Sequence, residues 1–227
     1  MTPPAKLELC ELFRSLCGET SQVGRPATFV RLSGCNLRCR WCDTQKAWQP
    51  GVWRPLPWVT ERVIAQGDSL VVVTGGEPLL QPACMNLCQA LLQAGREVLV
   101  ETNGSLDISS LPRGVRVIMD MKPPGSGEVE RMDFNNLQRL KPTDELKVVM
   151  SDRNDFNWAV ELLNTHPLPN GIEILFSPAA GRLDPGELAR WILTAQLPVR
   201  LQIQLHKIVF PSGCDGVPIL DGSVESQ

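Results

Sequence analysis

The feature that most constrains the fold is a repeated alternation of strand-like and helix-like segments along the 227 residues. Residues 70–73 form a continuous apolar, mostly β-branched run, as expected of a strand buried in a parallel sheet. About six strand–helix alternations predict an α/β fold with a parallel sheet and right-handed crossovers. The predicted strands are residues 6–14, 27–33, 70–73, 97–102, 115–119, 145–150, 171–176 and 199–204, and the predicted helices are 58–65, 81–94, 152–166 and 185–195.

Composition narrows the class of protein. The length suits one well-cored domain, and the chain is 43% hydrophobic and 21% charged with a net charge of −3. Lys and Arg are scattered, so nucleic-acid binding is not expected. The sequence has no run of roughly 18 apolar residues, so no membrane span is predicted. The first residues lack the apolar core of a signal peptide, and eight cysteines without a leader indicate a reducing cytoplasm.

Three cysteines stand close together at C-x3-C-x2-C spacing: Cys35, Cys39 and Cys42. A four-iron cluster is usually held by four cysteines, so three thiolates leave one iron open to a non-protein ligand. The alternative is a zinc site, which needs a fourth ligand. The candidates for that ligand are not at favoured zinc spacings; they are Cys10, Cys17, Cys84, Cys88, His166, His206 and Cys214. A disulfide reading is weaker because three is an odd number.

Further motifs follow the cysteines in a fixed order along the chain. Thr74-Gly75-Gly76-Glu77-Pro78 closes the apolar strand, and paired glycines let backbone amides approach a ligand. Together with the cysteine motif, this sequence resembles the radical S-adenosylmethionine superfamily. The motifs along the chain, taken together over roughly residues 8 to 211, resemble those of the 7-carboxy-7-deazaguanine synthase family. These motifs are residues 16–19, Arg31, 41–44, 74–78, 101–104 and 204–207.

The resemblance implies a single-domain partial (β/α)6-type radical SAM barrel over residues 1–211, followed by a tail over 212–227. It implies one 4Fe–4S cluster held by the three cysteines, with S-adenosylmethionine chelating the open iron. The carboxylate of Glu77 and nearby main-chain groups would hold the ammonium of methionine, and Lys122 would pair with the carboxylate. The implied cofactor-binding residues are Gly75, Gly76, Glu77, Thr102, Asp120, Met121, Lys122, Ser177, Pro178, Ala179 and Ala180.

The resemblance also implies a pterin site and a magnesium ion. Arg31 would fork onto the substrate carboxylate, and Thr44 would bind Mg2+ with Asp43 beside it. The implied substrate-binding residues are Leu16, Cys17, Gly18, Glu19, Arg31, Thr74, His206 and Pro211. The chain departs from the usual family pattern at three places: Cys17 stands where Gln is usual, loop 49–57 is short, and the chain continues past Pro211.

Read without the resemblance, most of these residues have simpler interpretations. Residues 16–19 read as a surface turn, Arg31 as a surface ion pair, and Asp43 with Thr44 as a local side-chain turn. Lys122 reads as a solvated lysine and His206 as a structural histidine. Cys84 and Cys88, at i and i+4 of a predicted helix, are expected to face the core as small hydrophobes.

The activity implied by the resemblance is that of a carbon–nitrogen lyase. A reduced cluster would cleave S-adenosylmethionine, and the resulting deoxyadenosyl radical would take hydrogen from C6 of 6-carboxy-5,6,7,8-tetrahydropterin. Ring contraction and loss of ammonia would give 7-carboxy-7-deazaguanine for queuosine biosynthesis. A homodimer and an electron donor such as flavodoxin are also implied. The alternatives are a glycyl-radical-enzyme activase and a non-catalytic metal-binding module.

Overall fold

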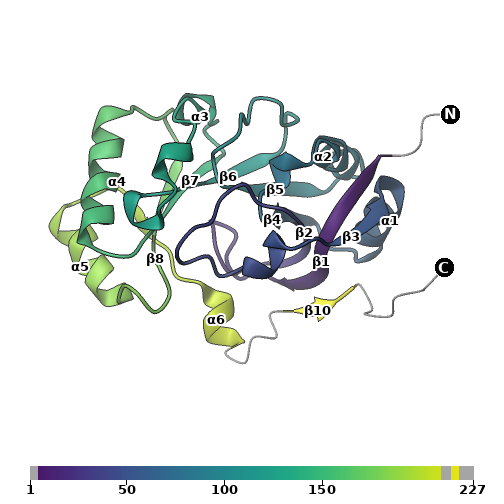
Figure 1. The fold of residues 1–227 in the computed structure, drawn as a ribbon, viewed down its shortest axis with the longest axis horizontal. Helices are drawn as coiled ribbons and strands as arrows, with labels where there is room; N and C mark the ends of the chain where they lie inside the picture. Colours follow the sequence, from purple (N-terminus) through teal and green to yellow (C-terminus); the bar gives the residue numbers. More distant parts are fainter. Residues whose placement is uncertain (1–4, 211–215, 220–227) are drawn as a thin grey trace.

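The computed structural model describes residues 5–210 and 216–219, which form one open sheet flanked by helices (Figure 1). The strand order is β10-β1-β2-β4-β5-β6-β7-β8-β9, with β3 also paired to β1. Strands β2 to β9 along this path are parallel, whereas β1 runs antiparallel to β2, β3 and β10. The sheet does not close on itself, so the α/β partial-barrel prediction is confirmed.

The parallel strands lie close to the ranges expected from sequence. The observed strands are β1 (Lys6–Leu16), β2 (Pro26–Leu32), β3 (Val52–Pro55), β4 (Leu70–Gly75), β5 (Glu97–Thr102), β6 (Arg116–Met121), β7 (Glu145–Met150), β8 (Glu173–Pro178), β9 (Arg200–Leu201) and β10 (Val217–Pro218). The apolar run at residues 70–73 is the core of β4, and all four side chains are buried.

The helices are α1 (Leu56–Ala65), α2 (Ala83–Gln93), α3 (Asn136–Arg139), α4 (Arg153–Thr165), α5 (Pro185–Thr194) and α6 (Leu205–Val209). Helices α1 to α5 pack on the side of the sheet that holds the main core, and α6 lies at a cavity. Helices α1 and α2 lie together beside the first strands, and α4 and α5 lie at the other end (Figure 1). Asp152 and Asp184 accept hydrogen bonds from the first-turn amides of α4 and α5, which fixes where both helices begin.

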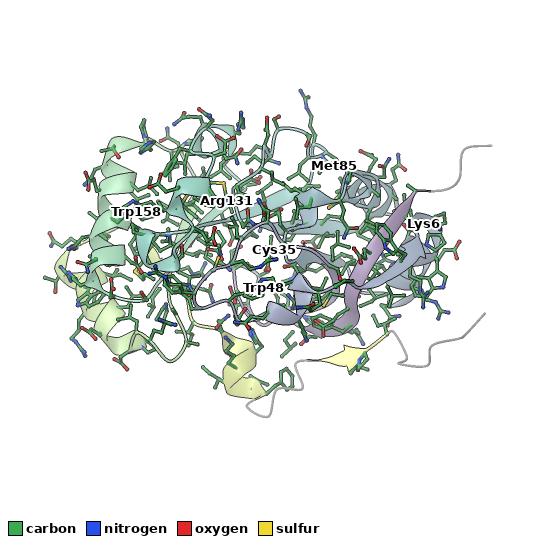
Figure 2. The ribbon with its side chains drawn as sticks, viewed as in Figure 1. Lys6, Cys35, Trp48, Met85, Arg131 and Trp158 are labelled. Carbon is green, nitrogen blue, oxygen red and sulfur yellow. The ribbon has the colours of Figure 1, made fainter. Side chains whose placement is uncertain are left out.

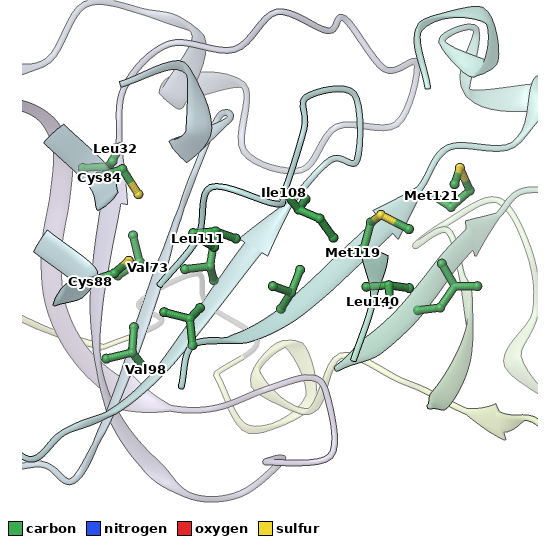
Figure 3. Close-up of a cluster of buried hydrophobic side chains, with 14 of the residues drawn as sticks. Leu32, Val73, Cys84, Cys88, Val98, Ile108, Leu111, Met119, Met121 and Leu140 are labelled. Atoms are coloured by element: carbon green, nitrogen blue, oxygen red, sulfur yellow. The ribbon is translucent and has the colours of Figure 1, made fainter. Parts of the chain in front are cut away.

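The two faces of the sheet are distinguished by side-chain alternation. In β4, Val71 and Val73 point into the main core with Cys84 and Cys88 of α2, while Leu70 and Val72 belong to a smaller cluster on the opposite face. Figure 3 shows Val73, Cys84 and Cys88 within the main core. Both cysteines are fully buried, as expected for core-facing thiols.

The smaller apolar cluster explains where a cavity forms. It contains Ala27, Leu70, Val72, Leu99 and Ile118, from the first halves of the parallel strands, and Cys17 from the turn after β1. Because side chains alternate along a strand, residues two positions further on share this face. These are Thr74, Glu101 and Asp120, which are polar. The inner face is therefore apolar at the start of the strands and polar at their carboxyl ends.

Two sequence predictions about local structure are wrong. The segment 49–57, expected to be a loop, contains β3, whose backbone pairs with the free edge of β1 at Lys6–Leu9. The last predicted strand, 199–204, ends at Leu201, and His206 and Lys207 lie in α6 rather than at a strand end. Gln204 is the residue that precedes this helix. Within the described part of the chain, the short β9 pairs with β8 alone.

Part of the predicted tail adds to the sheet. In β10, Val217 pairs with Arg14 and Pro218 with Phe13, and the amide of Ile219 donates to Leu12 O at 2.9 Å. The boundary between a 1–211 domain and a 212–227 tail stays a prediction, and Pro211 and Cys214 lie outside the described residues. Among the described residues, no helix combines the length and apolar character needed to cross a membrane.

Candidate active site

A cavity of about 490 Å3 opens at the carboxyl ends of the parallel strands. Its wall is built from the polar ends of β2, β4, β5, β6, β7 and β8, from the cysteine loop, and from residues before and within α6. Ligand sites in open parallel sheets form at this end because the loops after the strands converge there. The position of the cavity is thus a consequence of the strand direction.

The cysteine loop forms one side of this cavity. Cys35, Cys39 and Cys42 are free thiols, all three are half-buried, and all line the cavity. Figure 2 shows Cys35 between Trp48 and Arg131 in the middle of the molecule. The sulfur of Cys35 accepts from the Leu37 amide at 3.5 Å and from Asn103 Nδ2 at 3.9 Å. Such N–H donors to sulfur are a usual surrounding of iron–sulfur clusters.

The donor set of the loop fits a cluster. Burial raises the pKa of Cys39 to about 11, Lys122 opposes this rise, and the nearby Cys42 and Cys35 thiols add to it. The three thiols therefore lie close enough to repel one another as thiolates. A multi-iron centre removes that repulsion because it binds the deprotonated sulfurs. Within residues 5–210 and 216–219, no three His, Cys, Asp or Glu side chains are arranged to hold a single metal ion.

The Gly75-Gly76 pair joins β4 to the cysteine loop through the backbone. The Gly76 amide donates to Leu32 O at 3.1 Å, and the Glu77 amide donates to Gly34 O at 2.8 Å. A Cβ atom at Gly76 would collide with Gly34 O and with Cys35 Cβ. Only glycine permits this approach, so the strand end and the cysteine loop are held together at Gly76.

Glu77 lies behind the wall of the cavity rather than on its surface. Its side chain is fully buried, and its oxygens accept from the Leu79 amide, Thr102 Oγ1 and the Asn103 amide at 2.7–2.9 Å. Burial raises the pKa of this carboxyl, and the three donors oppose the rise. In this structure the Glu77 carboxylate organises the ends of β4 and β5, and the lining at this point is Gly75, Gly76 and Thr102.

The inner wall carries an arginine against aromatic rings. Phe13 and Phe29 stack with centroids 4.9 Å apart, and the Arg31 guanidinium lies 5.7 Å from the Phe13 centroid. Arg31 Nε also donates to Glu11 Oε2 at 2.8 Å. The side chain of Arg31 is 19% exposed and lines the cavity, so its position is fixed on a strand with donors left for a ligand.

The floor of the cavity is a network of buried charges. Lys147 Nζ lies 2.7 Å from Glu19 Oε2 and 3.5 Å from Asp120 Oδ2, and Asp120 also pairs with Lys122 at 2.9 Å. Burial opposes the charge on Lys147, but Glu19 and Asp120 outweigh it and hold the lysine pKa well above its usual range. These residues come from three different strands or loops and are brought together by the sheet.

Glu101 completes the floor. It accepts from Thr74 Oγ1 at 3.0 Å, and burial raises the pKa of its carboxyl, with Lys147 opposing and Glu19 adding to the rise. For Glu19 the balance is the reverse: burial opposes its ionisation, yet Lys147 and Gln204 lower the pKa. The floor therefore pairs an ionised Glu19 with a Glu101 that holds its proton to higher pH.

Helix α6 closes the cavity against the turn after β1. Gln204 Nε2 donates to Glu19 Oε1 at 2.6 Å and to Asp43 Oδ2 at 2.9 Å, and Lys207 Nζ pairs with the same Asp43 oxygen at 3.0 Å. The Leu205 amide donates to Gly18 O at 2.9 Å. Gln204 therefore links the turn after β1 to the cysteine loop, and Asp43 carries a salt bridge in addition to the hydrogen bond from Thr44 Oγ1 at 3.0 Å.

Comparison with known proteins decides the family. The sequence profile of the radical SAM superfamily matches residues 29–135. The chain is 39% identical to the 7-carboxy-7-deazaguanine synthase of Koribacter versatilis, over 93% of this chain and 100% of the relative. It is 38% identical to that of Chlorobaculum tepidum, over 96% of this chain and 100% of the relative. The chain belongs to the 7-carboxy-7-deazaguanine synthase family.

A solved structure agrees with this family in its fold. The crystal structure of QueE from Escherichia coli superposes with a TM-score of 0.72 at 24% identity, covering 88% of this chain and 95% of that chain. The crystal structure of archaeal TYW1 gives a TM-score of 0.55 at 16% identity, over 75% of this chain and 71% of that one. The solved structures thus confirm the fold, and the relatives at 38–39% identity confirm the family predicted from the motifs.

The structure brings most of the predicted site residues to one cavity. Those that line it are Leu16, Cys17, Gly18, Glu19, Arg31, Cys35, Cys39, Cys42, Asp43, Thr44, Thr74, Gly75, Gly76, Thr102, Asp120, Lys122, Ser177, Pro178, Ala179, Ala180 and His206. Glu77 and Met121 are buried behind the lining, and Pro211 lies outside the described residues. Lys122 is not a solvated lysine: its side chain is 14% exposed. The ligands that these residues bind stay predictions.

Sequence reasoning missed four lining residues of the network: Glu101, Lys147, Gln204 and Lys207. Lys147 had a usable signal, because it is a lone cation within the otherwise apolar end of the strand sequence ELKVVM. Glu101, Gln204 and Lys207 lie within motifs that carried the family resemblance, but no role was assigned to them. Their partners are distant in sequence, so pairing could not be read from local pattern.

Proposed function

We propose that this chain converts 6-carboxy-5,6,7,8-tetrahydropterin to 7-carboxy-7-deazaguanine and ammonia, as a radical SAM carbon–nitrogen lyase of queuosine biosynthesis. The observation that carries the proposal is that one cavity is lined by three free thiols on one side and by Arg31, Glu19 and His206 on another. The names of the relatives and the coverage of their full lengths support the same activity.

The proposed cofactors are a 4Fe–4S cluster, S-adenosylmethionine and Mg2+. Cys35, Cys39 and Cys42 would hold the cluster, and the backbone at Gly75 and Gly76, together with Thr102, would lie against the methionine part of S-adenosylmethionine. Residues 177–180 line the cavity at and just after the carboxyl end of β8 and would contact the rest of that cofactor. When bound, this pair supplies hydrogen-atom abstraction, which no side chain of the chain can perform.

Binding and orientation of the substrate would come from the chain itself. The Arg31 guanidinium has the fork geometry that a carboxylate accepts, and its ring and carboxylate contacts fix its direction. The ionised Glu19, which also lines the cavity, offers acceptors to N–H groups of the substrate. Thr44, with Asp43 beside it, would supply oxygen ligands to Mg2+, which retains several waters and takes substrate oxygens as its other ligands.

The remaining family properties are proposals too. We infer that the enzyme is a homodimer, that an electron donor such as flavodoxin reduces the cluster, and that it works in the cytoplasm, where thiols stay reduced. Light scattering of the cluster-loaded protein tests the dimer, and reduction of the cluster by flavodoxin, followed by electron paramagnetic resonance, tests the donor.

Product formation under strictly anaerobic conditions tests the activity. The reconstituted protein receives S-adenosylmethionine, Mg2+, dithionite and the carboxytetrahydropterin, and mass spectrometry identifies the products. We expect 7-carboxy-7-deazaguanine from the wild type and none from Cys39→Ala. Formation of 5′-deoxyadenosine with an untouched pterin would point to another radical enzyme, such as a glycyl-radical-enzyme activase. Neither product from fully loaded protein would favour a binding module.

A further inference from the structure

The most unusual charged residue outside the predicted site is Lys147. Its side chain is 9% exposed, and it lies in β7 between buried apolar neighbours. Burying an ammonium group is unfavourable unless carboxylates compensate it. The compensation comes from Glu19 Oε2 at 2.7 Å and Asp120 Oδ2 at 3.5 Å, and the Glu101 charge also acts on this lysine.

Lys147 lies on a regular strand, whereas the carboxylate that it contacts lies on a turn. It lies in the middle of a six-residue strand paired on both sides, opposite Asp120 in β6 and Leu175 in β8. Glu19 lies in the turn that follows β1, next to Thr20, whose φ is +71°. The paired strand fixes the backbone of Lys147, and its two acid partners restrict its side-chain rotamers. The ion pair with Lys147 therefore restricts the rotamers of the Glu19 side chain.

The remaining contacts of Glu19 leave it able to bind a ligand. One oxygen accepts from Lys147 and the other from Gln204 Nε2 at 2.6 Å. Each carboxylate oxygen has a second acceptor position. A pyrimidinone ring with an exocyclic amine presents two parallel N–H donors, which match the two oxygens of one carboxylate. Glu19 lines the cavity, and its two oxygens are oriented by Lys147 and Gln204.

We propose that Lys147 is a positioning residue, which fixes the Glu19 carboxylate as the acceptor for the N–H edge of the pterin ring. This inference rests on the proposed function, because it takes the carboxytetrahydropterin as the ligand. It adds a role for Lys147, a lining residue of β7 to which the sequence assigned none. Lys147 acts through Glu19 alone and not through Asp120, the acid it meets at a longer distance.

Equilibrium binding tests this role without turnover. Cluster-loaded protein without reductant is titrated with the carboxytetrahydropterin and, separately, with S-adenosylmethionine. We expect Lys147→Met and Glu19→Gln each to raise the Kd for the pterin about 10- to 100-fold, the usual effect of losing a hydrogen bond to a charged group. The double variant is expected to bind like Glu19→Gln alone, since contacting residues that act as a unit are non-additive.

Three controls separate positioning from general damage. Lys141→Met removes a lysine that is 41% exposed and pairs with Asp144 outside the cavity, and it is expected to leave both Kd values unchanged. Lys147→Arg keeps the charge and is expected to recover part of the pterin affinity. Asp120→Asn and Lys147→Met are expected to have additive effects on the Kd for the pterin when they are combined. Lys147→Met alone is expected to leave the Kd for S-adenosylmethionine within twofold of the wild-type value.

The outcomes distinguish this inference from the proposed function. Additive losses for Lys147→Met and Glu19→Gln, or coupling of Lys147 to Asp120 instead, overturn the inference even if the wild type makes product. If Lys147→Met and Glu19→Gln lose pterin affinity non-additively but the wild type makes no product, the inference is supported and the proposed activity is overturned. No pterin binding by the wild type overturns both. If Lys147→Met does not fold, Glu19→Gln and the double variant decide: equal Kd values support the inference, and a further tenfold loss overturns it.

Discussion

Gly18 lies directly against the imidazole ring of His206. A Cβ atom added at Gly18 would collide with Nδ1, Cγ and Cβ of that ring, and the Gly18 carbonyl accepts from the Leu205 amide at 2.9 Å. The turn after β1 and helix α6 therefore meet with no room for a side chain. Both residues line the cavity, so the width of the cavity at this point depends on the absence of a side chain at Gly18.

Gly18→Ala is expected to push α6 away and to weaken pterin binding about tenfold or more while leaving the sheet folded. The added methyl has no space beside the histidine ring, and His206 and Gln204 move together because they are two residues apart. Titration with the pterin measures the effect, and circular dichroism checks the fold. Combining the change with His206→Ala removes most of the clash, so the double variant is expected to regain thermal stability. A Gly18→Ala variant that is as stable as the wild type and binds the pterin with unchanged affinity would contradict the close contact between Gly18 and His206.

Each of the variants Cys35→Ala, Cys39→Ala and Cys42→Ala is expected to lose iron–sulfur absorbance after anaerobic reconstitution. All three thiols line the cavity, and a cluster held by two thiolates is not retained. Cys10→Ala is the matched control, because Cys10 is half-buried on β1 and does not line the cavity. Iron and sulfide analysis is expected to give about four of each per chain in the control. Loss of iron in Cys10→Ala would disagree with this assignment.

Glu77→Gln is expected to lower the free energy of unfolding by about 2 kcal/mol, because an NH2 group would face donors where a carboxylate now accepts three hydrogen bonds. The ends of β4 and β5 should loosen together, and binding of S-adenosylmethionine is expected to weaken as a result. Urea denaturation measures the stability. Glu61→Gln, on α1 at an exposed position, is the control and is expected to change nothing. Equal stability of both variants would count against the organising role of Glu77.

Asp68 gives the fold a pH dependence at the opposite end of the strands. Arg14 Nε and Nη2 donate to its carboxylate at 2.8–2.9 Å, and Thr28 Oγ1 donates at 2.8 Å. The Arg14 hydrogen bonds lower the pKa of Asp68, with Thr28 also contributing and burial opposing. A lowered pKa means that the stabilisation is complete above the unfolded-state value of about 3.9 and is lost as the pH falls through the folded-state value.

Asp68→Asn is accordingly expected to destabilise the protein at pH 7 and to match the wild type at a pH below the folded-state pKa of Asp68. Thermal unfolding measured between pH 7 and the acid limit of folding checks the convergence. Glu61→Gln is the control, since Glu61 lies at an exposed position of α1. A stability difference for Asp68→Asn that stays constant across this pH range would show that the carboxylate charge is not the cause.

Local pattern predicted most of the sheet and the cysteine site, and the reasons are visible in particular residues. The continuous run at 70–73 and the capping aspartates at 152 and 184 act over a few residues, so they can be read directly. Strand β3 was not predicted, because Pro50, Gly51 and Pro55 around Val52 and Trp53 indicate a loop and the pairing partner on β1 is distant in sequence. The network of buried charges at the floor of the cavity could not be predicted from local pattern either, because Lys147 and Glu19 are 128 residues apart in the sequence.

The two antiparallel additions to β1 have a consequence for assembly. Strand β3 hydrogen-bonds to Lys6–Leu9 of β1, and β10 to Phe13 and Arg14 on the same strand. An uncovered edge strand of eleven residues would offer its amides and carbonyls to any passing strand. Here this edge is occupied by two short pieces of the same polypeptide, and the opposite end of the sheet finishes in the two-residue β9. Subunits of this protein are therefore expected to associate through side chains rather than by merging their sheets.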